Sequence, residues 1–118
     1  MQEIPVGLDL ARLVGRTLDS VTFAEYAVAF ALGEDATLSV QYGYAFTPPG
    51  AETPIVERIP VRNSGVLSLI GGIVESCSWT RQAELVLQFG SGGQLRCLIS
   101  PDPFESYIVS IGDSEWFI

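Results

Sequence analysis

The sequence contains one short pattern twice. Residues 13–23 read LVGRTLDSVTF and residues 69–79 read LIGGIVESCSW, and the two align without a gap at a spacing of 56 residues. Leu, Gly and Ser recur unchanged at three positions, and five further pairs keep their chemical character: Val14/Ile70, Leu18/Val74, Asp19/Glu75, Thr22/Ser78 and Phe23/Trp79. Self-similarity at a fixed spacing is the signature of a repeated structural unit. The repeat predicts two similar halves, about residues 8–62 and 64–118, made by internal duplication.

In the first half, each segment after the repeated pattern alternates between apolar and other residues. Residues 17–23 and 26–32 predict two strands, and residues 37–46, with ten residues of unbroken alternation, predict one long strand. A proline-rich loop follows at residues 47–54, and residues 55–61 predict an edge strand that Pro60 ends.

Alternation also predicts which side chains share a face of the sheet, because successive strand residues point to opposite sides. The first strand places Asp19, Val21 and Phe23 on one side and Leu18, Ser20 and Thr22 on the other. The second strand has an apolar face of Val28, Phe30 and Leu32. Its other face is made of Ala27, Ala29 and Ala31, where polar residues are expected. This alanine face predicts close packing by another segment or by a second copy of the chain, and so allows a homodimer.

The second half repeats the order of the first. Strands are predicted at residues 73–79, 84–89 and 94–100, and a last hairpin joins residues 106–111 to 115–118. Residues 8–14 and 66–70 predict two short helices, the second with Ser64 available as N-cap. The predicted fold is mainly β, with duplicated antiparallel meanders and two short helices. It packs as a pseudo-two-fold sandwich or as one bent sheet.

The charge of the chain excludes several functions. Its 118 residues suit one domain, and 14 acidic against 6 basic side chains give a net charge of −8, with no histidine and no lysine. Binding of nucleic acid or of an anionic membrane surface requires a cationic face, so neither is expected. The N-terminus shows no basic leader, and the longest apolar run, residues 66–74, is too short to span a bilayer. A cytoplasmic protein is expected.

The two cysteines are predicted to belong to the scaffold. Cys77 falls where the first copy has Val21, and Cys97 falls where it has Val40. A slot that valine fills equally well is typical of a reduced, buried thiol. A nucleophilic cysteine also needs a general base such as histidine, and the chain has none.

Carboxylates near the C-terminus are the remaining candidates for chemistry. Asp102, Glu105, Asp113 and Glu115 lie within a short stretch and offer oxygen ligands for a hard cation or a pair for acid–base work. Their spacing matches no calcium loop, and acids at β-turns more often cap backbone amides. Gly71-Gly72 and the glycines at 90–93 lack the lysine of a phosphate loop. We therefore predict no catalytic, metal or cofactor site.

The same acids and two aromatic residues are the candidate partner-binding residues. Trp116 and Phe117 are adjacent on a predicted strand and must point to opposite faces. Aromatic anchors are typical of protein interfaces. Glu105 either fixes the turn before Tyr107 through backbone amides or binds a cationic side chain of a partner. The candidate set is Asp102, Glu105, Asp113, Glu115, Trp116 and Phe117.

The L-x-G openings at Leu13 and Leu69 and the closing Phe104-Glu105-Ser106-Tyr107-Ile108 carry a resemblance over nearly the whole chain. They resemble a family of small bacterial domains of uncharacterised function. Such families are suspected to be immunity proteins that neutralise toxins of interbacterial competition. The resemblance implies no catalytic residue.

These observations favour a non-catalytic protein-interaction module, an immunity-like inhibitor that meets a protein partner, such as a basic toxin, through an acidic surface. The alternative is a small-ligand binding domain with a cavity between the two half-sheets. A hydrolase built on the C-terminal carboxylates is a third, weaker interpretation.

Overall fold

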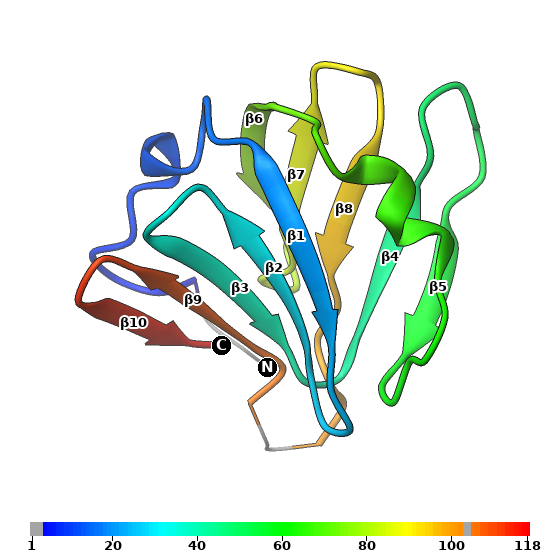
Figure 1. Cartoon of the computed structure of the whole chain (residues 1–118). Coiled ribbons are helices and arrows are strands. Elements are labelled where there is room, and N and C mark those ends of the chain that lie inside the picture. Colours follow the sequence, from blue (N-terminus) through cyan, green and yellow to red (C-terminus); the bar gives the residue numbers. More distant parts are fainter. Residues whose placement is uncertain (1–3, 103–104) are drawn as a thin grey trace.

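A computed structural model describes residues 4–102 and 105–118 and confirms a mainly β fold (Figure 1). Ten strands of the described residues form two antiparallel sheets of five. The first sheet has, in spatial order, β1 (Leu18–Phe23), β2 (Val28–Leu32), β3 (Ala36–Val40), β9 (Tyr107–Ile111) and β10 (Ser114–Phe117). The second sheet has β5 (Ile55–Arg58), β4 (Gly43–Thr47), β8 (Gln94–Cys97), β7 (Leu85–Phe89) and β6 (Val74–Trp79).

The two short helices lie at the predicted places and are both 3₁₀ turns. η1 (Leu10–Arg12) begins where the Asp9 carboxylate accepts the Ala11 N–H, and η2 (Gly65–Leu69) begins where the Ser64 hydroxyl accepts the Val66 N–H. These side chains satisfy amide groups that a helix start leaves without a partner.

The predicted single strand over residues 37–46 is wrong, because the chain changes sheets in the middle of it. β3 ends at Val40 in the first sheet, and β4 begins at Gly43 in the second. The N–H groups of Gln41 and Tyr42 both donate to the Ser106 carbonyl, at 2.9 and 3.2 Å. The sequence alternates through this bend because large apolar residues occupy every second position in both β3 and β4, although β4 buries Gly43, Tyr44, Ala45 and Phe46 in succession. The pattern therefore could not reveal the crossing.

The predicted faces of the first strand are also wrong, because β1 contains a bulge. Leu18 pairs with Leu32, but Ser20 pairs with Ala31, so one extra residue on β1 shifts the alternation at Asp19. Leu18 is consequently buried, and Val21 and Phe23 pack against the same core. β6 has the corresponding irregularity between Val74 and Ser76.

The last hairpin of each half lies in the sheet of the other half. β9 of the second half pairs with β3 of the first, and β4 of the first half pairs with β8 of the second. Strand order is the same in both sheets when β1, β2 and β3 are matched with β6, β7 and β8. Common origin of the halves by duplication stays a prediction.

The sheets meet where the two copies of the repeated pattern lie side by side. Thr17 forms an isolated antiparallel bridge with Ile73, its counterpart in the repeat. Gly15 N–H donates to the Val74 carbonyl and Gly71 N–H to the Leu18 carbonyl, both at 2.8 Å. Both glycines have positive φ, +87° and +91°, which side-chain-bearing residues rarely adopt. The turn glycines of the pattern therefore join the halves.

One core cluster contains residues of both halves. The predicted inner face of β2 is confirmed, since Val28, Phe30 and Leu32 are fully buried. Two buried tyrosines occupy matching positions, Tyr44 opposite Cys97 and Tyr107 opposite Val40. The Tyr44 ring packs edge-on against Phe30, with 5.3 Å between ring centroids. The side chains of the two sheets thus meet in one shared core.

Candidate functional site

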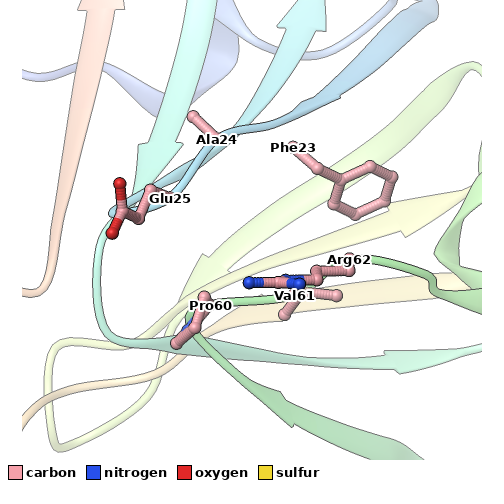
Figure 2. Close-up of a pocket in the computed structure, with 6 residues that line it drawn as sticks. All are labelled: Phe23, Ala24, Glu25, Pro60, Val61 and Arg62. Atoms are coloured by element: carbon pink, nitrogen blue, oxygen red, sulfur yellow. The ribbon is translucent and has the colours of Figure 1, made fainter.

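An open groove lies at one end of the sandwich, between the turn that joins β1 to β2 and the segment after β5. One part of it, of about 520 Å³, is shown in Figure 2 and is lined by Phe23, Ala24, Glu25, Pro60, Val61 and Arg62. A neighbouring part, of about 640 Å³, shares Glu25 and Pro60 and adds Tyr26, Gln41, Ile59 and Glu105. We call the two parts together the end groove.

The end groove presents charged groups that have no ion-pair partner among the described residues. Within 4–102 and 105–118, the ion pairs are Arg16–Asp35 and Arg96–Glu84. In Figure 2, Glu25 extends from the strand turn and Arg62 extends from the opposite wall, below Phe23. The lining of this part of the groove therefore includes both a carboxylate and a guanidinium.

Aromatic surface lies beside these charges. Tyr26, on the turn between the strands, is 77% exposed, although large apolar surfaces are usually buried. Close by, the Arg58 guanidinium lies over the Tyr42 ring, 3.8 Å from its centroid. Such rings with an apolar body and a polar tip are typical anchors of protein interfaces.

The structure separates the acids that the sequence grouped near the C-terminus. Glu105 lines the end groove, whereas Asp113 lies in the turn between β9 and β10. The five residues of β9 place these two acids about 17 Å apart along the strand direction. Asp102 is exposed, and its N–H donates to the Ser100 hydroxyl at 3.1 Å. Phe104, the first residue of the closing motif, and Pro103 before it lie outside the described residues.

No group of three or more Asp, Glu, Cys or His side chains that could hold a metal ion occurs within the described residues. The side chain of Glu105 is exposed, and Ser106 next to it is fully buried. The Ser106 hydroxyl accepts the Ser100 N–H at 2.7 Å. The buried hydroxyl of Ser106, and not the carboxylate of Glu105, thus stabilises the segment that leads from Ser100 to β9.

Trp116 and Phe117 point to opposite faces, as adjacent strand residues must. Trp116 is half-buried, packs against the core, and donates from Nε1 to the Val6 carbonyl at 3.3 Å. Phe117 is 60% exposed. Only Phe117 of this pair is available to a partner.

Both cysteines are free, and burial shapes their chemistry. Cys97 is fully buried, and burial raises the pKa of its thiol. Cys77 is half-buried, and burial raises the pKa of its thiol to about 11. Because the thiolate is the nucleophilic form, both sulfurs are protonated and unreactive at neutral pH.

A third, smaller pocket of about 350 Å³ opens over the outer face of the second sheet, where Thr47, Gln94 and Arg96 face Glu52. Arg96 Nε is buried without a hydrogen-bond partner and lies 3.9 Å from Glu84 Oε1. This nitrogen is accounted for by a loose ion pair with Glu84, and it does not define a ligand site.

Sequence reasoning singled out Glu105 but missed Glu25, Tyr26 and Arg62. Glu25 and Tyr26 lie in the turn between β1 and β2, although Tyr26 was predicted to begin the second strand. Arg62 follows Pro60, after the end of β5. An aromatic residue at a turn tip was the one available signal, because turn residues are normally small or polar. The meeting of Glu25 and Tyr26 with Glu105 depends on the crossing of the hairpins, which no local pattern shows.

Comparisons with protein-family models, with curated proteins and with solved structures found no match to this chain. Among the described residues, no helix has the length and apolar character needed to cross a membrane.

Proposed function

We propose that this protein is a non-catalytic protein-interaction module that binds a basic partner through the end groove, as an immunity-like inhibitor of a toxin would. The observation that carries the proposal is the meeting of Glu25 and Glu105, 80 residues apart in sequence, beside the exposed Tyr26. Carboxylates around an aromatic anchor suit an arginine or lysine side chain of a partner.

The charge of the whole chain supports the same partner class. A net charge of −8 raises the rate at which a basic protein arrives, because long-range attraction steers the encounter. The proposal includes no chemical step, since the chain has no histidine or lysine and its thiols stay protonated. We also propose that the protein acts in the cytoplasm of a bacterium. There it would protect the cell from a toxin that the same cell produces.

Binding of a small ligand is the second candidate, and one observation favours it. The 520 Å³ part of the groove lies within the usual range of ligand sites and is lined by both Glu25 and Arg62. Opposite charges across a partly apolar pocket suit a small zwitterion. This candidate site lies at the end of the sandwich, whereas the sequence-based alternative placed a cavity between the two half-sheets.

The proposal is tested by co-expressing the chain with the product of the neighbouring reading frame and measuring growth and complex formation. We expect the wild-type chain to protect growth and to form a stable complex. Glu25→Arg and Glu105→Arg each weaken the complex by about tenfold or more, since like charges then face the partner. Glu52→Arg, on the loop between β4 and β5, changes net charge equally and serves as the control.

Protection and affinity that survive both groove substitutions would contradict this function. If free amino acids bind tightly and shift the amide resonances of the groove residues, and no protein complex forms, the small-ligand candidate is supported instead. Both experiments use the whole chain. The amide spectrum of each variant is recorded before binding is measured, so that a folding defect is recognised.

A further inference from the structure

β10 is an edge strand whose outer backbone groups are free within the described part of the chain. β10 pairs only with β9 in the first sheet. Ile118 and Tyr107 exchange both of their N–H to carbonyl bonds, at 2.9 and 3.1 Å. In an antiparallel ladder such pairs alternate with pairs that make no direct bond. The peptide groups of Glu115 and Phe117 therefore point away from β9, toward the open side.

The side chains along this edge form a defined pattern. Glu115 and Phe117 lie on one face of β10, and both are exposed. Trp116, on the other face, packs against the core and holds the strand in place. Asp113 is exposed in the turn just before the strand. The edge thus offers two backbone donor–acceptor positions, one exposed ring and two carboxylates.

We propose that β10 accepts an added β-strand from an extended, basic segment of a partner protein. The backbone groups of Glu115 and Phe117 would pair with the segment, as in other cases of strand addition to a sheet edge. A cationic side chain of the segment lies against Glu115, and an apolar one covers Phe117. This inference rests on the proposed function only in taking the partner to be basic.

Charge decides between the occupants of this edge. Pairing of two β10 strands would join two molecules of net charge −8, each with Asp113 and Glu115 exposed beside the edge, so a second copy is disfavoured. Of the other three edge strands, β1 and β6 are joined to each other at their starts by the Thr17–Ile73 bridge, and β5 is bounded by Pro54 and Pro60 and presents Arg58. Prolines at an edge discourage strand addition, and an arginine repels a basic segment. Of β5 and β10, β10 is the edge that fits a basic segment.

The edge also continues toward the end groove. The N–H of Ser106 donates to the carbonyl of Ile118, so the end of β10 lies beside Glu105. Figure 1 shows β10 ending near the connection that leads into β9. One partner is therefore able to contact both surfaces.

The test uses an acetylated, amidated hexapeptide of alternating arginine and valine with the full-length, isotope-labelled chain. At saturating peptide, we expect exchange of the Glu115 and Phe117 amide hydrogens to slow by at least about tenfold, since both gain acceptors. The amides of Val56 and Arg58 on β5 stay unchanged. The same peptide with N-methylated valines, which cannot complete the ladder, fails to bind.

Two substitutions separate this edge from general charge effects and from the groove. Glu115→Arg weakens hexapeptide binding by about tenfold, whereas Glu52→Arg, with the same change in net charge, has a much smaller effect. Tyr26→Ala leaves hexapeptide binding intact, so failure of the groove proposal does not affect this result. The inference is overturned if the peptide does not bind, if both arginine variants weaken it equally, or if protection appears on β5.

Discussion

At the scale of single residues, two buried tyrosines show how the core uses polar atoms. Tyr107 and Tyr44 sit at matching places in the two sheets, and each hydroxyl has a partner. Tyr107 donates to the Ala83 carbonyl at 2.6 Å, and Tyr44 donates to the Ser64 hydroxyl at 2.9 Å. A buried hydroxyl without such a bond costs stability, so these bonds decide whether tyrosine is tolerated there.

Tyr107→Phe should therefore lower the free energy of unfolding by about 1–3 kcal/mol, because the Ala83 carbonyl is left buried without its donor. Urea denaturation followed by tryptophan fluorescence measures this change. Tyr26→Phe removes the same hydroxyl from an exposed ring and should change stability by less than about 0.5 kcal/mol. Equal effects of the two substitutions would mean that the buried bond contributes nothing.

The thiol of Cys77, which stands at the position of Val21 in the first copy, makes the stability of the fold depend on pH. Burial raises the pKa of its thiol from 9.0 to about 11, so the folded chain keeps a proton that the unfolded chain loses. The resulting stabilisation is complete below pH 9 and is lost as pH rises from 9 to 11. Cys77→Val, which places the residue of the first copy at this position, should make the curve shallower between pH 9 and 11. The loss due to Cys97, whose pKa burial also raises, should remain.

Unfolding midpoints at several values between pH 8 and pH 12 measure the effect of Cys77→Val. Burial raises the pKa of Tyr44 from 10.0 to about 12, so a second loss of stability, from pH 10 to 12, should remain in the variant. Identical curves for wild type and variant between pH 9 and 11 would show that Cys77 does not titrate there.

At the scale of elements, most strands could be predicted, because alternation and turn residues are local signals. β2, β7 and the β9–β10 hairpin lie within one or two residues of the prediction. The break between β3 and β4 could not be predicted, since it depends on the Ser106 carbonyl more than sixty residues away. The bulge in β1 was hidden because Asp19 and Ser20 are both polar and fit either register.

Gly43 marks the point where the chain enters the second sheet. A Cβ atom there would lie 2.8 Å from the Glu57 carbonyl oxygen, closer than side chains come to backbone. Gly43→Ala should cost about 1–3 kcal/mol, because β4 and β5 must move apart. Gly90→Ala is the matched control, since its nearest contact is an ordinary 3.5 Å.

Thermal unfolding of the two alanine variants measures the difference. A domain of this size loses roughly 3–8 °C of melting temperature for each 1 kcal/mol. Gly43→Ala should therefore melt clearly below Gly90→Ala. Similar melting temperatures would indicate that β5 yields to the added methyl group without cost.

At the scale of the whole molecule, the repeat predicted two similar units but could not show how they join. Equivalent positions in a repeat say nothing about which half supplies a strand's neighbour. The structure pairs β3 with β9 and β8 with β4, so each half completes the other's sheet. The same exchange brings Glu105 to the turn at Glu25 and Tyr26. Local sequence patterns could therefore not predict the groove.

Separate expression of residues 1–62 and 63–118 tests this exchange most directly. Each fragment lacks the hairpin that completes its own three-stranded sheet, so neither should give a dispersed amide spectrum as a monomer. Mixing the fragments in equal amounts should restore the spectrum of the intact chain. A fragment that folds by itself as a stable monomer would contradict the exchange of hairpins and the groove built on it.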